Sequence, residues 1–284
     1  MSKKPVRHFI SAVLLALAAI VAGLGVWAFW IEPASLRIQE YETKLKNWPT
    51  ACDGLSVAIV ADIHAGAPHI GLDKVKKVVE ITNAEKPDLI LLLGDYVIHG
   101  VLGGKFIGPE KTAPILSKLR APLGVFAILG NHDWWLDANR VAKAISINPI
   151  TLLEDANVEI GLNDCKFHLV GISDFREGPH DIRKAMHGVP RRSPVIILTH
   201  DPDIFPHLPK QASLAIAGHT HGGQVNLPWF GRLKVPSQYG ARFAAGMIVE
   251  GTQKYFVSPG IGTSILPVRF RVPPEVSLLK FRSQ

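Results

Sequence analysis

Cysteine is scarce in this chain, because 284 residues contain only Cys52 and Cys165, and no Cys-x-x-Cys pair occurs. The absence of such a pair argues against a zinc site built from thiolates. Two thiols so far apart in sequence could pair in an oxidising compartment, but we expect them to act as small buried hydrophobic residues. Cysteine usage therefore does not decide the compartment.

Runs of lysine and arginine interleaved with aromatic residues are also absent, although the net charge is +7. A chain without such a stripe is not expected to bind nucleic acid. Its mildly basic balance suits an anionic substrate or a lipid surface. Internal repeats and low-complexity tracts are missing too, and no feature implies an obligate protein partner. A length of 284 residues permits one large domain with a well-buried core.

Charge is missing from the 23 residues between Phe9 and Ile31, which follow a short basic tail at residues 1–8. As a helix this stretch would be about 35 Å long, enough to cross a bilayer. A cleaved signal peptide is the alternative, but it would have a shorter apolar region and small residues before its cleavage site. Bulky Trp27, Phe29 and Trp30 occupy that place instead. We therefore expect residues 9–31 to form an uncleaved, single-pass anchor in the cell (inner) membrane.

The orientation of this anchor is less strongly encoded. Equal numbers of basic residues precede and follow it: Lys3, Lys4 and Arg7 before, Arg37, Lys44 and Lys46 after. A short basic tail directly before the apolar run usually stays in the cytoplasm. The sequence therefore favours an extracytoplasmic position for the residues that follow.

Beyond the anchor, the pattern predicts a connector at residues 32–54, helical in its middle, and a domain at residues 55–284. Apolar runs predict strands at 55–61, 88–93 and 124–129, alternating with helices at 72–84, 110–119 and 137–147. This alternation favours a largely parallel sheet. Strands then follow at shorter intervals, at 166–171, 194–199, 212–217, 243–249, 254–258 and 275–280, which indicates a second, mixed sheet. The predicted fold is a four-layer α/β/β/α sandwich, with the loops 222–240 and 258–274 around a site.

Residues that bind metals recur at the ends of these predicted strands. They stand in Asp62-Ile63-His64, Gly94-Asp95-Tyr96, Gly130-Asn131-His132-Asp133, Thr199-His200-Asp201 and Gly218-His219-Thr220-His221. Because the carboxyl ends of parallel strands meet at one edge of a sheet, we expect these side chains to converge. Any one of the histidines alone would more often be structural. Carboxylates, imidazoles and one amide together are what divalent cations require.

In this order the motifs resemble those of the calcineurin-like metallophosphoesterase superfamily, over residues 55 to 280. Two further stretches, 218–224 and 259–264, with 266–270 after them, resemble the membrane-anchored bacterial phosphodiesterases of that superfamily. Some relatives in that subgroup cleave the pyrophosphate of UDP-diacylglucosamine. The resemblance implies the same four-layer sandwich and a site for two divalent ions, manganese first, with iron or zinc as alternatives.

The resemblance also assigns roles to residues. One metal would be held by Asp62, His64, Asp95 and His221, and the other by Asp95, Asn131, His200 and His219. Asp95 would bridge the two ions, and His132 would act on the phosphoryl oxygens or the leaving group. In several relatives an acid just after the Gly-Asp motif orients this histidine. Tyr96 stands there instead, which leaves Asp133 as the candidate for orienting His132.

The expected function is therefore a phosphodiesterase or pyrophosphatase dependent on two metals, acting at the membrane on an anionic, lipid-linked phosphoester. A phosphomonoesterase acting on nucleotides or proteins is the alternative. A non-catalytic scaffold is disfavoured because every ligand position is filled.

Two loops could supply further contacts to this substrate. Arg232 and Arg269 are candidate substrate-binding residues, unless they belong to a solvated basic face. Apolar Trp229 and Phe230 precede Arg232, and we expect this combination to contact lipid, unless the apolar residues pack on the core.

Overall fold

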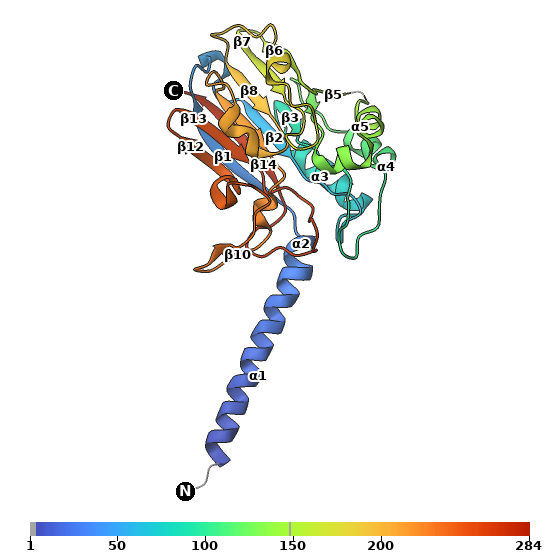
Figure 1. Cartoon of the computed structure of the whole chain (residues 1–284), viewed down its shortest axis with the longest axis vertical. Coiled ribbons are helices and arrows are strands. Elements are labelled where there is room, and N and C mark those ends of the chain that lie inside the picture. The colour runs from blue at the N-terminus through green and yellow to red at the C-terminus, as the bar shows by residue number, and fades with distance from the viewer. Residues whose placement is uncertain (1–3, 148) are drawn as a thin grey trace.

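The computed structural model describes residues 4–147 and 149–284, and residues 1–3 of the expected basic tail lie outside it. A long N-terminal helix projects from the folded body of the molecule (Figure 1). It consists of α1 (Lys4–Val26), a π-helical turn η1 (Trp27–Ile31) and a short α2 (Glu32–Ala34). The segment Arg7–Ala34 is long and apolar enough to cross a membrane, and an 18-residue window within it has a mean hydropathy of 2.6. The expected N-terminal apolar helix is thus present.

The segment after the helix differs from the expected connector. Residues 37–45, predicted to be helical, form the strand β1 (Arg37–Leu45), which pairs in parallel with the C-terminal strand β14 (Glu275–Ser283). Tyr41 and Leu45 alternate inward against the apolar cluster between the sheets, with charged residues between them. This two-residue period is that of a strand, and pairing with β14 outweighs the local helical preference.

The end of the membrane helix is docked on the folded body. The carboxylate of Glu32, itself buried, accepts hydrogen bonds from the indole N–H of Trp27 at 2.7 Å and from the backbone N–H of Val272 at 2.6 Å. The carbonyl of Ala28 accepts a hydrogen bond from the backbone N–H of Arg269 at 2.9 Å. The helix is therefore attached directly to the loop at residues 258–272.

The first sheet has six strands in the order β1-β14-β2-β3-β4-β5. Strands β2 to β5 run parallel, and β14 runs antiparallel to β2. Alternate residues of β2 face opposite sides: Val57 and Ile59 belong to the cluster between the sheets, Ala58 and Val60 to the cluster under the helices. The bounds are β2 (Ser56–Val60), β3 (Leu89–Leu92), β4 (Val125–Ala127) and β5 (Ile150–Leu152).

The second sheet also has six strands, in the order β12-β13-β9-β8-β7-β6, and it is mixed as expected. The strand predicted at 275–280 is not part of it, because β14 pairs with β1 and β2 in the first sheet. Ile196 and Leu198 of β8 face the first sheet, whereas Val195 and Ile197 face a third apolar cluster on the far side. A small hairpin, β10 (Asn226–Leu227) and β11 (Gly231–Arg232), stands apart from both sheets. The bounds are β6 (Ala156–Leu162), β7 (Cys165–Gly171), β8 (Val195–Leu198), β9 (Leu214–Ala217), β12 (Gly246–Glu250) and β13 (Gln253–Val257).

Three helices cover the outer face of the first sheet: α3 (Leu72–Ala84), α4 (Pro109–Leu116) and α5 (Asn131–Ile145) (Figure 1). The outer face of the second sheet packs instead on short turns, α6 (Ile182–Ala185), η3 (Pro202–His207) and η5 (Gly240–Phe243). The remaining 3-10 turns are η2 (Thr50–Cys52) and η4 (His221–Gly223). The expected α/β fold with mixed sheets is confirmed.

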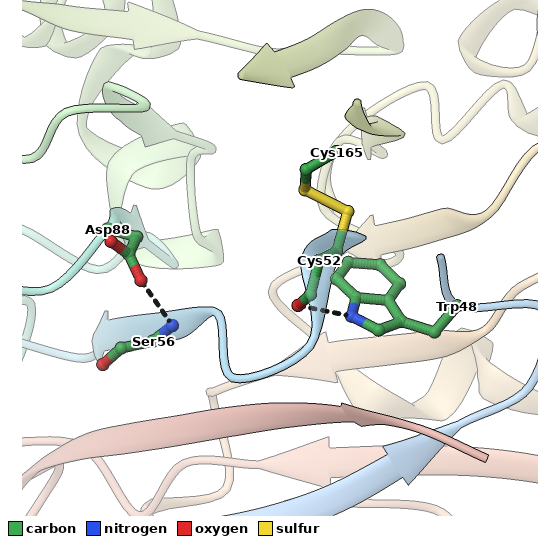
Figure 2. Close-up of a disulfide and its surroundings, with 5 residues drawn as sticks. All are labelled: Trp48, Cys52, Ser56, Asp88 and Cys165. Atoms are coloured by element: carbon green, nitrogen blue, oxygen red, sulfur yellow. Dashed lines mark hydrogen bonds between the residues drawn. A yellow bond between two sulfur atoms is a disulfide. The ribbon is translucent and has the colours of Figure 1, made fainter. Parts of the chain in front are cut away.

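The two cysteines form a disulfide, which corrects the expectation that they are unpaired hydrophobic residues (Figure 2). Cys52 in η2 precedes β2, and Cys165 begins β7, so the bond joins the two sheets at the edge where these strands start. The indole N–H of Trp48 donates to the Cys52 carbonyl at 3.0 Å and closes the turn around it. The pairing depends on the packing of two sheets, which cysteine spacing does not reveal.

We expect this disulfide to contribute substantially to stability. It closes a loop of 113 residues, for which restriction of the unfolded chain predicts about 4–5 kcal/mol. Urea unfolding of the oxidised chain and of a Cys52→Ala, Cys165→Ala double variant, in the same detergent, measures the difference. A difference near zero without reductant would contradict the prediction, and added reductant should abolish the difference.

Candidate metal centre

The residues predicted to bind metal lie at the carboxyl ends of four strands and at the start of one helix. Asp62 and His64 follow β2, Asp95 follows β3, His200 follows β8, and His219 with His221 follow β9. Asn131 is the first residue of α5, which begins six residues before the predicted start of this helix. All seven are buried. The two sheets thus direct one set of polar side chains to a single edge.

The backbone of this site is strained. Five of the seven residues have positive φ angles, although none is glycine: Asp62 (50°), His64 (46°), Asp95 (55°), His219 (68°) and His221 (50°). Residues with a Cβ atom rarely adopt this conformation, and each instance costs on the order of 1–3 kcal/mol. Such strain persists only where the surrounding structure enforces it, and it clusters at functional sites.

Glycines allow the ligand loops to approach one another. A Cβ atom on Gly94, where φ is +86°, would lie 2.2 Å from the backbone nitrogen of Gly130. A Cβ atom on Gly130 would lie 2.3 Å from Oδ1 of Asp95. Neither position can carry a side chain without moving a predicted ligand, and this explains why glycine precedes Asp95 and Asn131.

Asp95 lies between two groups of potential ligands. Its Oδ2 atom is 3.3 Å from Nε2 of His64 and 3.3 Å from Nε2 of His200. On one side, ligand atoms of Asp62, His64 and His221 lie within 4.8 Å of one another, and on the other side so do those of Asp95, His200 and His219. Oδ1 of Asn131 lies in the second group, 2.9 Å from Nδ1 of His219 and 3.2 Å from Nε2 of His200.

Several buried polar atoms of the site have no hydrogen-bond partner among the described residues: Oδ2 of Asp62, both ring nitrogens of His64, Nε2 of His219 and Nδ1 of His221. Unpaired buried polar atoms are costly, because each loses its hydration without compensation. A cluster of them with this mixture of oxygen and nitrogen donors fits divalent cations.

The protonation states of two of these histidines suit metal ligation. Burial lowers the pKa of His219 to about 3 and lowers that of His221 well below its usual range, so both imidazoles are neutral at pH 7. Burial opposes the charged form of His200 as well, but the Asp95 carboxylate outweighs it and raises the pKa. Nδ1 of His200 donates to the carbonyl of Leu93 at 2.7 Å, which directs Nε2 towards Asp95.

His132 lies beside this cluster and is oriented by aromatic rings. Its ring centroid is 4.6 Å from that of His64, edge to face, and 4.7 Å from that of Trp135. Burial lowers its pKa to about 3. Asp133 does not orient His132, contrary to the candidate role given from the sequence. Its carboxylate accepts hydrogen bonds from the backbone N–H groups of Asp95, Tyr96 and Gly130 at 2.8–3.0 Å and so fixes the two ligand loops.

Comparison with known proteins places this geometry in a family. The sequence profile of the calcineurin-like phosphoesterases matches residues 55–223, more than half of the chain. The chain belongs to the calcineurin-like phosphoesterase family. The predicted ligands, from Asp62 to His221, all lie within the matched range.

Relatives match along nearly their whole lengths. The metallophosphoesterase YkuE of Bacillus subtilis is 30% identical, covering 100% of this chain and 99% of the relative. UDP-2,3-diacylglucosamine pyrophosphatase LpxG of Chlamydia trachomatis is 27% identical, with 95% and 97% covered. Phosphodiesterase YaeI of Escherichia coli is 26% identical, with 96% and 98% covered. Family membership, together with these relatives, shows that the protein is a hydrolase of phosphoric esters. The family uses divalent metals.

The two arginines predicted to bind substrate occupy different places. Arg269 is fully buried, and its guanidinium donates to the backbone carbonyls of Pro259, Gly260, Gly262 and Val272. It therefore holds the 258–272 loop together, and its assignment to substrate is wrong. Arg232 is half-buried in β11, and its Nε donates to the carbonyl of Gly222 at 2.8 Å, next to His221.

Two residues at the mouth of the site were missed. Trp135 is 48% exposed beside His132. His99 is exposed, and its ring centroid is 5.7 Å from that of Trp135. Nothing in their local sequence distinguishes them, because their position depends on how the loop after β3 meets the start of α5.

Proposed function

We propose that this metallophosphoesterase binds two divalent ions and hydrolyses a phosphodiester or pyrophosphate. The observation that carries the proposal is the position of Asp95, whose Oδ2 atom is equally close to a histidine of each ligand group. One carboxylate shared by two cations holds them about 3.5–4 Å apart, the separation used in two-metal hydrolysis. Manganese, iron and zinc all suit the mixed donor set, with manganese as our first expectation.

In this proposal Asp62, His64 and His221 hold one ion with Asp95, and Asn131, His200 and His219 hold the other with it. Bound divalent ions polarise phosphoryl oxygens and lower the pKa of water. The neutral oxygen of Asn131 limits the negative charge of the site, which leaves it able to accept a phosphate anion.

His132 would act on the substrate and not on a metal. Its buried imidazole lies between His64 and the exposed Trp135. Its backbone N–H donates to Oδ1 of Asp95 at 2.9 Å, which ties its position to the proposed bridging residue. From there its ring can hydrogen-bond a phosphoryl oxygen or pass a proton to the leaving oxygen.

Two substitutions separate these roles. Asp95→Ala should lose both metals and activity, because each ion loses a ligand. His132→Ala should keep its metals and lose turnover by about 10²–10⁴-fold. Metal content by mass spectrometry, and turnover of bis-(p-nitrophenyl) phosphate with p-nitrophenyl phosphate alongside, measure both effects. His187→Ala, at an exposed position, is the control.

Undiminished activity of Asp95→Ala after chelation and reloading would refute the two-metal site. Loss of metals from His132→Ala would make His132 a ligand, because its ring nitrogen also lies within 4.8 Å of ligand atoms of His64 and Asp95. Turnover of the monoester in preference to the diester would favour the phosphomonoesterase alternative.

We further propose that the substrate is lipid-linked. A cavity of about 380 Å³ extends from Thr220 and His221 to an apolar wall formed by Leu233, Ile265, Leu266 and Val268. An apolar cavity next to the site suits an acyl chain attached to the scissile phosphate. LpxG is named for a substrate of this kind.

Two further exposed apolar side chains lie in the hairpin that precedes Leu233 of this wall. Trp229 is 98% exposed and Phe230 is 75% exposed, so neither packs on the core. Their hairpin, β10–β11, lies at the level where the helix meets the folded body (Figure 1). The neighbouring 258–272 loop is hydrogen-bonded to Ala28 and Glu32 of the helix. These tips are placed to enter the bilayer interface beside the anchor.

Removing the tips should therefore impair lipid turnover selectively. A Trp229→Ala, Phe230→Ala double variant of the full chain in vesicles should hydrolyse UDP-2,3-diacylglucosamine at least about tenfold more slowly, because the interface contact is lost. Its turnover of water-soluble bis-(p-nitrophenyl) phosphate should be unchanged. Leu162→Ala, an exposed apolar residue on the β6–β7 turn, is the control. Equal effects on both substrates would count against a lipid-linked substrate.

We propose that the enzyme is anchored in the cell membrane by its N-terminal helix, with the catalytic domain outside the cytoplasm. Balanced flanking charges leave the orientation open, but the Cys52–Cys165 disulfide supports it, since structural disulfides form and persist in oxidising compartments.

Protease added to intact spheroplasts should therefore digest the catalytic domain. The same treatment of lysed spheroplasts, and of a cytoplasmic marker protein, provides the controls. Survival of the domain until the membrane is broken would reverse the proposed topology.

A further inference from the structure

Three arginines from distant parts of the chain line one small cavity beside the membrane helix. Arg37 begins β1, Arg232 ends β11, and Arg271 lies in the 258–272 loop. The cavity has a volume of about 150 Å³ and also includes Tyr41, Glu275 and Val272. None of the seven predicted metal ligands lines it, so it is separate from the metal centre.

The positive charge of this cavity is only partly neutralised. Glu275 is its one carboxylate. The Glu275 side chain is committed already, because it accepts hydrogen bonds from Arg37 at 2.9 Å, Tyr41 at 2.8 Å and Ser277 at 2.8 Å. It can balance one guanidinium, which leaves two positive charges in excess.

The other two guanidinium groups have free donors. The Arg232 side chain donates only through Nε, to the carbonyl of Gly222, among the described residues. The Arg271 side chain has no hydrogen-bond or ion-pair partner among them. Paired guanidinium donors of this kind match the oxygens of a phosphate group.

The position of the cavity indicates where such a phosphate comes from. Arg37 follows the last residue of α2 by three positions. Val272, in the cavity wall, donates its N–H to Glu32 at the end of the membrane helix. In a membrane-spanning chain this places the three arginines at the depth of the lipid headgroups. The cavity is also smaller than the ~300–1,000 Å³ of pockets that enclose whole drug-sized ligands, and suits a single headgroup phosphate.

We propose that this cavity binds the headgroup phosphate of an anionic membrane phospholipid. Arg232 and Arg271 contact the phosphate oxygens, and Arg37, held by Glu275, adds positive charge. Because the cavity lies beside the helix and the 258–272 loop, the bound lipid fixes the rotation of the domain about its anchor. The membrane surface thereby helps to hold in place the 258–272 loop, which packs on Asp62 and His64.

The test compares lipid retention by the full chain purified in detergent. Native mass spectrometry measures binding of phosphatidylglycerol and of phosphatidylcholine to the wild type and to Arg271→Gln, Arg271→Lys and Arg183→Gln. Arg183 is an exposed arginine on α6 and serves as the matched control. Binding is measured without turnover, so its outcome is independent of the proposed catalytic function, and Asp95→Ala should retain the lipid.

We expect the wild type to retain one phosphatidylglycerol in preference to phosphatidylcholine. Arg271→Gln should weaken that retention about tenfold, the loss typical of one charge-assisted hydrogen bond. Arg271→Lys should fall between the two, and Arg183→Gln should match the wild type.

Equal retention of the two lipids, or equal loss in Arg271→Gln and Arg183→Gln, would overturn the proposal and make the cavity an ordinary solvated basic surface. A further arm adds millimolar inorganic phosphate. Displacement of phosphatidylglycerol by inorganic phosphate at that concentration would show a site for soluble phosphate and would also overturn the assignment to lipid.

Discussion

The carboxylate of Asp95 is the feature on which the arrangement of the site depends. It lies in a left-handed backbone conformation directly after a buried strand, with Gly94 before it and Gly130 in contact. Its Oδ2 atom lies close to His64 on one side of the cluster and to His200 on the other. Its Oδ1 atom accepts a hydrogen bond from the backbone N–H of His132. Asp133 holds this loop and the start of α5 together through three backbone N–H groups. The strain of the loop is maintained because each neighbouring element is itself anchored in a buried strand or helix.

The loop at residues 258–272 connects the N-terminal helix to the polar cluster. Arg269 uses its buried guanidinium to gather four backbone carbonyls of the 258–272 loop, and this loop passes close to two predicted ligands. A Cβ atom on Gly260 would lie 2.6 Å from Oδ2 of Asp62, and one on Gly262 would lie 2.6 Å from Cβ of His64. Because Ala28 and Glu32 bond to the same loop, the anchor is packed against the wall of the site. The N-terminal apolar helix and the wall of the site are therefore mechanically connected.

The disulfide joins η2 to β7 at the edge of the sheets opposite the polar cluster. The strained ligand loops lie where strands end, and the disulfide lies where β7 begins and just before β2 begins. Between them, the cluster shared by both sheets consists of alternating apolar residues from each. The disulfide therefore lies at one edge of the sheets, and the strained backbone of the polar cluster lies at the other.

The sequence by itself determined the convergence of the candidate ligands and the α/β fold. Candidate ligands at the ends of apolar runs can be recognised from the neighbouring sequence. Both the alternation of residues along a strand and the residue types of the loop that follows are short-range properties. The seven predicted ligands thus converge as expected, while their binding of metal stays a prediction. The roles of Asp133, Arg269, Trp135 and the two cysteines were decided only by tertiary structure. Each depends on which distant segment packs beside it: Asp133 on two backbone loops, Arg269 on four carbonyls, Cys52 on a strand of the other sheet. The strand β1 was missed for the same reason, since its partner β14 lies at the far end of the chain and supplies the pairing that local propensity does not encode.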